Sequence, residues 1–523
     1  MVKTNRKENT IKNVTIDIVS YFVTVILRFF VRFIFIYTIG TEYLGLNSVF
    51  TSIISMFSLA EMGFNLTVGT MLYKPLAEND VKKINSLINL TKKIFYTVGY
   101  VVLFGGCLLI PFIQHFISNS TISLLNLRIF YFIHVLSSSV SYFFTHKVVL
   151  ISADQKQYIY KRTTTIFNLI MSGIQITLLL LFKNYIWFLV AQLLFSIIPN
   201  FVVSRIADKM YPYLKQKEVE KLTKEEKKDF YKKSFGAFFH KLGSIVVNAT
   251  DSILISSSAL LGVVVLGKYS NYTLIFTSIS QLAYLCISGA IASIGNLWVT
   301  SDKKKVLDVF KKLQFIQLWI TVFCVACLFS LTQPVVETLG VFLKEDLKLG
   351  FSIVIISCVN FYLSTMQTVI NMFKNSKGLF WHDRYKAIAE AVVNLVVSII
   401  LMRFMGIIGV LLGTTISIVI VNVWYEPFVL FKHGFEANSV KRYMTDYFRT
   451  YIFNVLLVIF VTAATFIPIY FLPSGVFWLI LKFAIGVIIP NVIMILIYWK
   501  SDKFKYCTNI VKSIVKKSKN TTQ

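Results

Sequence analysis

Two arginines stand four residues apart in the first long apolar stretch of the chain. Arg28 and Arg32 would therefore lie one helical turn apart and point roughly the same way. A guanidinium group stays protonated and offers paired donors, which suits the oxygens of a diphosphate. The pair predicts an anion site at membrane depth, where an ionisable group is costly. The alternative is that both arginines pair with Glu61 or Asp251 and only hold helices together.

A second cationic point lies further along the chain. His240 and Lys241 are adjacent at the start of a later apolar stretch. They could extend a cationic path begun by the two arginines. Equally, the Lys241 side chain could reach back to the membrane surface, as long cationic side chains near helix ends do.

Three acids fall inside apolar stretches and are candidates for coupling transport to an ion gradient. Asp251 stands among small and hydroxyl-bearing residues, where a carboxylate could take up a proton or a cation. Glu61 precedes Gly63, which could break its helix, and Glu390 is the third acid. An ion pair with Arg28 or Arg32 is the competing interpretation for Asp251 and Glu61.

The elements that carry these residues are predicted from composition. Of 523 residues 56% are hydrophobic and only 15% are charged, and the mean hydropathy is +0.69. A soluble chain of this length needs more polar surface, so we predict an all-α, polytopic membrane protein. About fourteen apolar runs are long enough to cross hydrocarbon. They are 16–37, 44–63, 94–116, 127–150, 163–181, 185–203, 235–255, 272–294, 313–331, 349–370, 387–404, 407–424, 452–472 and 476–499.

The excess of basic residues follows the predicted topology. Lys and Arg number 53 against 25 acids, giving a net charge of +28. Most of these cations fall in alternate loops and in the two termini, which is the positive-inside pattern. We therefore expect both termini in the cytoplasm, and the charge does not indicate a nucleic-acid partner. The loops expected outside carry few cations: Lys183, Lys268, Lys344, Lys348 and Arg403, with Arg128 at an outer helix end.

The chain shows signs of an internal duplication. Gly40, Leu44 and Gly45 recur with the same spacing as Gly262, Leu266 and Gly267, each set between the first two spans of its half. Transporters are commonly built from such repeats. The predicted organisation is a six-helix lobe (1–207), a polar cytoplasmic linker (208–234), a second six-helix lobe (235–431), and two further spans with a basic tail (432–523).

Enzyme chemistry has no sequence support. HExxH, GxSxG and P-loop motifs are absent from the sequence. The six cysteines fall mostly inside apolar runs, and the Cys324/Cys327 pair in mid-span favours packing over redox chemistry. We predict no catalytic residues, no metal and no cofactor.

Three blocks of the sequence carry a family resemblance. Residues 43–93 (beginning "YLGLNSVFTSI"), 248–275 ("NATDSILISSS") and 406–417 ("GIIGVLLGTTIS") resemble Gram-positive polysaccharide flippases of the Wzx type. These belong to the multidrug/oligosaccharidyl-lipid/polysaccharide exporter superfamily. The resemblance implies two six-helix lobes, two extra helices, and first-span arginines matching Arg28 and Arg32 that face a central cationic cavity.

The same resemblance implies a function. It indicates alternating access that moves an undecaprenyl-diphosphate-linked oligosaccharide across the bacterial cytoplasmic membrane, for capsule, exopolysaccharide or teichoic-type polymers. A polysaccharide polymerase and glycosyltransferases would be further partners. A cation-coupled multidrug exporter of the same fold is the first alternative, for which more acids and fewer arginines are expected. A membrane-embedded polymerase is the second, but it would need a large outer loop, and a mere scaffold would leave the intramembrane charges unexplained.

Overall fold

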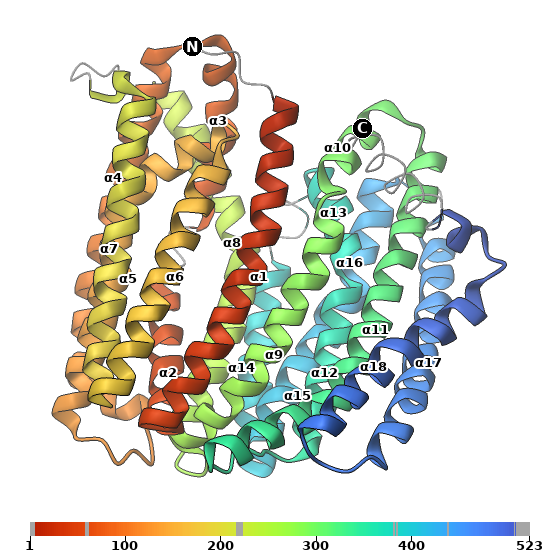
Figure 1. Ribbon diagram of the computed structural model, residues 1–523. Helices are drawn as coiled ribbons and strands as arrows, with labels where there is room; N and C mark the ends of the chain where they lie inside the picture. Colours follow the sequence, from red (N-terminus) through yellow and green to blue (C-terminus); the bar gives the residue numbers. More distant parts are fainter. Residues whose placement is uncertain are drawn as a thin grey trace, which may run out of the picture. The chain divides into compact units, whose positions relative to one another are not determined.

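The computed structural model describes residues 6–57, 62–215, 223–379, 382, 385–436, 439–506 and 508 (Figure 1). Every regular element in these ranges is a helix, so the predicted all-α membrane bundle is confirmed. The helices form two compact units. Unit 1 comprises Met1–Ser270 and Arg384–Leu395, and unit 2 comprises Asn271–Asp383 and Val396–Gln523.

Unit 1 is a bundle of long helices. In it α5 packs against α4 and α7, α6 packs against α1 and α7, and α8 packs against α2 and α3. Its elements are α1 (Arg6–Ile39), α2 (Thr41–Phe57), α3 (Met62–Glu78), α4 (Val81–Leu108), η2 (Ile110–Phe116), α5 (Leu124–Ala153), α6 (Gln157–Phe182), α7 (Tyr185–Met210), η3 (Pro212–Lys215), α8 (Lys224–Ser257), the start of α9 (Gly262–Ser288) and the start of α14 (Lys386–Met405).

Local sequence sets where several of these helices begin. The Asp80 carboxylate accepts a hydrogen bond from Lys83 N at 2.9 Å and starts α4. Thr223 and Glu226 form a reciprocal capping box at the start of α8, with Glu226 N donating to Thr223 Oγ1 at 3.2 Å. Each bond satisfies a backbone N–H that a helix start leaves without a partner.

Two glycines of the predicted repeat let α2 and α9 meet backbone to backbone. A Cβ on Gly45 would lie 2.0 Å from Val263 O, and a Cβ on Gly267 would lie 2.2 Å from Thr41 O. The contacts are reciprocal. Gly45 of the first repeat contacts the start of α9, and Gly267 of the second repeat contacts the start of α2. No side chain larger than hydrogen fits either position without moving a helix.

The other repeat positions also have matching roles. Gly40 and Gly262 adopt positive φ values of +87° and +74°, which L residues rarely take, and each begins its helix. Leu44 and Leu266 are both buried, at 4% and 1% exposure. The sequence echo therefore marks two equivalent helix starts that cross each other.

The loop that joins η2 to α5 is hydrogen-bonded to these helices. The Glu42 carboxylate accepts hydrogen bonds from Ser120 Oγ at 2.7 Å and from Thr121 N and Oγ1 at 2.7 and 2.6 Å. Ser118 N donates to Ser256 O at 2.8 Å, at the end of α8. The loop thus ties α2 to α8.

Unit 2 is organised around one 41-residue helix, α11, which packs against α12, α17 and α18. An aromatic core lies near the start of α11. The ring centroids of Phe310 and Phe373 lie 5.2 Å apart, and those of Trp298 and Phe435 lie 5.0 Å apart. The elements are the rest of α9, α10 (Ile291–Thr300), α11 (Lys303–Leu343), α12 (Phe351–Met366), α13 (Thr368–Ser376), the rest of α14, α15 (Ile407–Ser417), η5 (Ile418–Asn422), α16 (Val423–Val429), η6 (Leu430–Gly434), α17 (Val440–Tyr470) and α18 (Val476–Tyr498).

The predicted number of fourteen spans is not confirmed. Twelve helices among the described residues are long and apolar enough to cross a membrane. The predicted span 44–63 is divided between α2 and α3, each 17 residues long, and residues 58–61 lie outside the described ranges. The predicted span 235–255 is the second part of α8, whose first part is polar. The last part of the predicted linker, residues 224–234, is therefore continuous with the apolar part of α8, and the lobe borders stay a prediction.

Candidate functional site

The two arginines of α1 have different surroundings. Arg28 is exposed, and no hydrogen bond or ion pair joins it to any described residue. Arg32 is half-buried, and its Nη1 donates to Ser270 O and lies 3.4 Å from Ser270 Oγ. The Arg32 guanidinium group is thus hydrogen-bonded to α9, while the Arg28 guanidinium group is exposed.

Both arginines lie away from the ends of a candidate membrane span, Thr15–Ile39. Arg28 lies eleven residues before Ile39, the last residue of the helix. At 1.5 Å per residue this is about 16 Å, roughly half of a hydrocarbon core about 30 Å thick. An exposed cation at that depth needs water or an anion beside it.

Two consecutive residues of α9 are linked to Arg32 and to Asp251 respectively. Ser270 accepts the bond from Arg32, and the preceding residue, Tyr269, is close enough to interact electrostatically with the Asp251 carboxylate of α8. Ser270 Oγ donates in turn to Gly267 O at 2.7 Å, within the glycine crossing. The crossing therefore positions both a cation and a carboxylate.

The remaining predicted site residues are only partly described. Glu61 lies outside the described ranges. His240 and Lys241 belong to α8, and their side chains are not among those described. Glu390 is half-buried in the part of α14 that belongs to unit 1.

The most deeply buried charges were missed by the sequence analysis. Lys374 Nζ of α13 lies 3.1 Å from Glu426 Oε2 of α16, and the two side chains are 1% and 0% exposed. The segment that carries Glu426 lies between two π-helical turns, η5 and η6. The sequence analysis did not single out Lys374, although it directly follows the buried residues Met372 and Phe373.

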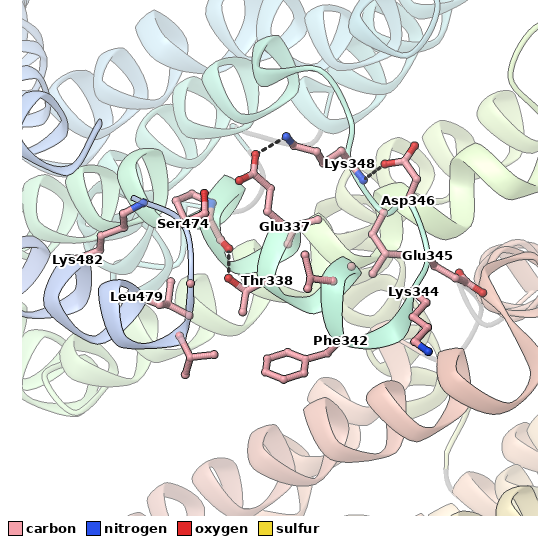
Figure 2. Close-up of a pocket in the computed structure, with 17 residues that line it drawn as sticks. Glu337, Thr338, Phe342, Lys344, Glu345, Asp346, Lys348, Ser474, Leu479 and Lys482 are labelled. Carbon is pink, nitrogen blue, oxygen red and sulfur yellow. Dashed lines mark hydrogen bonds and ion pairs between the residues drawn. The ribbon is translucent and has the colours of Figure 1, made fainter. Parts of the chain in front are cut away.

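A mixed-charge cavity of about 510 Å³ lies among the loops that follow α11 and precede α18 (Figure 2). Lys348 Nζ lies 2.5 Å from Glu337 Oε1, and Lys348 N donates to Asp346 Oδ1 at 3.1 Å. Lys482 of α18 lines this cavity and is 7% exposed. Because acids and bases alternate around the cavity, it does not form a purely cationic site.

A known protein family matches the part of the chain that carries both arginines and the glycine crossing. The family described as "Polysaccharide biosynthesis protein" matches residues 10–292, more than half of the chain. The chain belongs to this family. The match covers α1 to α9 and thus the glycine crossing and both arginines. No curated protein matches the chain.

Solved structures support the fold assigned to this member of the polysaccharide biosynthesis family. The structure described as "Lipid II flippase MurJ, inward closed conformation" superposes with a TM-score of 0.59 at 15% identity, over 92% of this chain and 98% of that one. An inward-facing multidrug resistance MATE family transporter of the MOP superfamily gives 0.60 at 12% identity, over 79% and 96%. Identity this low shows a shared fold alone. The resemblance noted in the sequence is confirmed at this level.

Proposed function

We propose that the protein is a flippase that carries an undecaprenyl-diphosphate-linked oligosaccharide across the bacterial cytoplasmic membrane by alternating access. The main support is Arg28, an exposed guanidinium group near mid-membrane on α1 with Arg32 one turn away. The family match to polysaccharide biosynthesis proteins agrees with this substrate class.

The chemistry of the substrate fits such a path. The sugar and diphosphate need a hydrated, cationic route, whereas the polyprenyl tail can stay in lipid. A guanidinium group binds phosphate oxygens through paired donors and stays charged. Arg28 would hold the diphosphate, Arg32 would set the approach of α1 to α9, and His240 and Lys241 would extend the cationic path.

The orientation we propose places both termini and the stretch 208–233 in the cytoplasm, on the distribution of Lys and Arg. The energy source we propose is a proton or cation gradient acting through Asp251, Glu61 or Glu390. Uptake of a cation at a buried carboxylate removes a charge and so shifts the balance between two facing states. A polymerase and glycosyltransferases would act before and after this step.

A cation-coupled multidrug exporter is the second candidate, favoured by the similarity to the MATE fold. Reconstituted vesicles separate the two functions. The purified protein should speed the movement of a fluorescent, short-chain prenyl-diphosphate oligosaccharide between leaflets, measured by quenching from one side. It should leave a phosphatidylcholine analogue and an organic cation such as ethidium unmoved. Transport of ethidium without the glycolipid would establish the exporter and reject the flippase.

A further inference from the structure

A cavity of about 600 Å³ lies at one end of α11, α17 and α18, entirely within unit 2. The first turns of α11 and α17 meet the last turn of α18 there, because α18 runs opposite to the other two. Our proposed orientation puts this end at the cytoplasmic surface.

Three cations stand at the rim of this cavity. Lys311 comes from α11, Arg449 from α17, and Lys503 from the segment after α18, and all three are exposed. Across the described part of the chain, none of the three forms an ion pair or a hydrogen bond, even though Asp446 lines the same cavity. The rim is therefore net positive and available to an anion.

The segment that carries Lys503 is held against α11. Trp319 stacks on Phe504 at 5.7 Å between ring centroids, and Lys312 Nζ lies 4.8 Å from the centre of the Tyr506 ring. Partial burial and the charge of Lys311 lower the pKa of Lys503, which indicates that two cations share one small space. Cations that share a small space and outnumber the acid beside them favour a bound anion.

Below the rim, two polar atoms lack partners. Gln314 Nε2 and Tyr451 Oη are buried, and neither has a hydrogen-bond partner among the residues that the structure describes. Both residues line the cavity. A buried donor without a partner is costly, so a ligand with acceptor oxygens would stabilise this layer.

The floor of the cavity is apolar. Phe315, Leu318 and Met366 line it, and Phe315 packs edge to face on Tyr498 with centroids 4.8 Å apart. The lining thus brings cationic, polar and apolar side chains together in one cavity. A phospholipid carries the matching groups, which are a phosphate, ester oxygens and acyl chains.

We propose that this cavity is a binding site for an anionic phospholipid, with the phosphate held by Lys311, Arg449 and Lys503, the ester region by Gln314 and Tyr451, and one acyl chain against Phe315. A basic pocket between membrane helices at the cytoplasmic side is well suited to such a headgroup. The leaflet concerned rests on the proposed orientation, but binding itself does not depend on the transported substrate.

Native mass spectrometry of the full-length protein tests this proposal directly. The protein, purified in a non-ionic detergent, is titrated with phosphatidylglycerol, with phosphatidylcholine of the same chains, and with inorganic phosphate. We expect one tightly retained phosphatidylglycerol and much weaker retention of phosphatidylcholine. The triple variant Lys311→Gln/Arg449→Gln/Lys503→Gln should weaken phosphatidylglycerol binding by about a hundredfold, since each cation near the headgroup contributes.

The matched control removes three other exposed cations at the same end. Lys304→Gln/Lys441→Gln/Lys500→Gln has the same net charge as the test variant but leaves the cavity intact. The control variant should bind phosphatidylglycerol as the wild type does. An equal loss of affinity in the control variant would mean that general surface charge causes the effect, and it would overturn the proposed site. Tyr451→Phe, which changes no charge, should also lower affinity. Equal retention of both lipids, or full displacement by inorganic phosphate at equal concentration, would reject a phospholipid site.

Discussion

The α1 arginines of unit 1 and the Lys374–Glu426 pair of unit 2 present intramembrane charge in opposite ways. Lys374 and Glu426 are closed off, with 1% and 0% exposure and their charged atoms 3.1 Å apart. Arg28 is exposed, and no ion pair or hydrogen bond to it occurs in the described ranges. A closed pair satisfies itself and holds helices together, whereas an open cation at depth requires a partner from outside the chain.

This difference shows that residue type and depth do not by themselves assign a role. Arg32 lies between the two extremes, because its guanidinium group is fastened to a backbone carbonyl of α9 without losing its charge. The role of each charged side chain depends on whether another helix supplies a hydrogen-bond or ion-pair partner for it. Variants that remove one member of each arrangement should therefore have different consequences.

The largest effect is expected from Glu426→Gln. It removes the carboxylate charge that lies 3.1 Å from the buried Lys374 ammonium, and loss of one member of a buried pair costs about 3–5 kcal/mol of folding stability. Thermal unfolding in detergent should show a large fall in the melting temperature. The double variant Lys374→Met/Glu426→Leu should recover most of it, since a well-packed apolar pair can replace a buried ion pair.

The exposed pair of the same unit provides the control. Lys303 Nζ lies 2.6 Å from Glu436 Oε2, but the side chains are 59% and 62% exposed. Glu436→Gln should leave the melting temperature almost unchanged. An equal fall in both variants would mean that burial does not distinguish the two pairs.

The second-largest effect is expected for Arg28→Gln, which should reduce transport without reducing folding stability. Arg28→Gln should reduce movement of the prenyl-diphosphate glycolipid about tenfold or more, the loss expected for a charge-assisted hydrogen bond. Its melting temperature should equal that of the wild type. Arg32→Gln should reduce transport and also lower stability, because the bond to Ser270 is lost.

Arg403→Gln is the matched control, since Arg403 is an exposed arginine in the last turn of α14. Transport by this variant should be normal. If the Arg28→Gln defect were instead relieved by Asp251→Asn, the two residues would form a structural pair and the open-cation interpretation would fail.

A smaller change is expected at Asp251, which has neither the full burial of Glu426 nor the exposure of Arg28. Asp251→Asn mimics the neutral carboxyl group, so transport should continue but become insensitive to imposed pH or sodium gradients. Vesicles with and without a gradient measure this directly. Transport by the variant that still responds to the gradient would exclude Asp251 from coupling.

The sequence predicted the helical membrane fold because a long apolar run has few alternatives in lipid. It also identified Gly45 and Gly267 as matching positions of a repeat, but it did not predict that each lies against the backbone of the other helix. It missed the Lys374–Glu426 pair because the partners lie 52 positions apart on two short helices, and neither segment has a sequence pattern that indicates its partner. Whether Asp251 faces Arg32 or a transported ion likewise depends on helix packing, which composition does not determine.

The smallest effect is expected at the Lys83–Glu226 pair, which joins α4 to the start of α8 near the surface. The bond from Lys83 and the backbone bond from Thr223 lower the pKa of Glu226. A lowered folded-state pKa stabilises the protein above the unfolded pKa of about 4.3, and this contribution disappears as the pH falls through the lower folded value. Because both side chains are about one-third exposed, the stabilisation should be about 0–1 kcal/mol. Glu226→Gln should therefore lower the melting temperature slightly at pH 7, with the gap to the wild type closing as the pH falls below about 4. High salt should narrow the gap as well, and a gap that widens in acid would mean that Glu226 stabilises the fold in its protonated form.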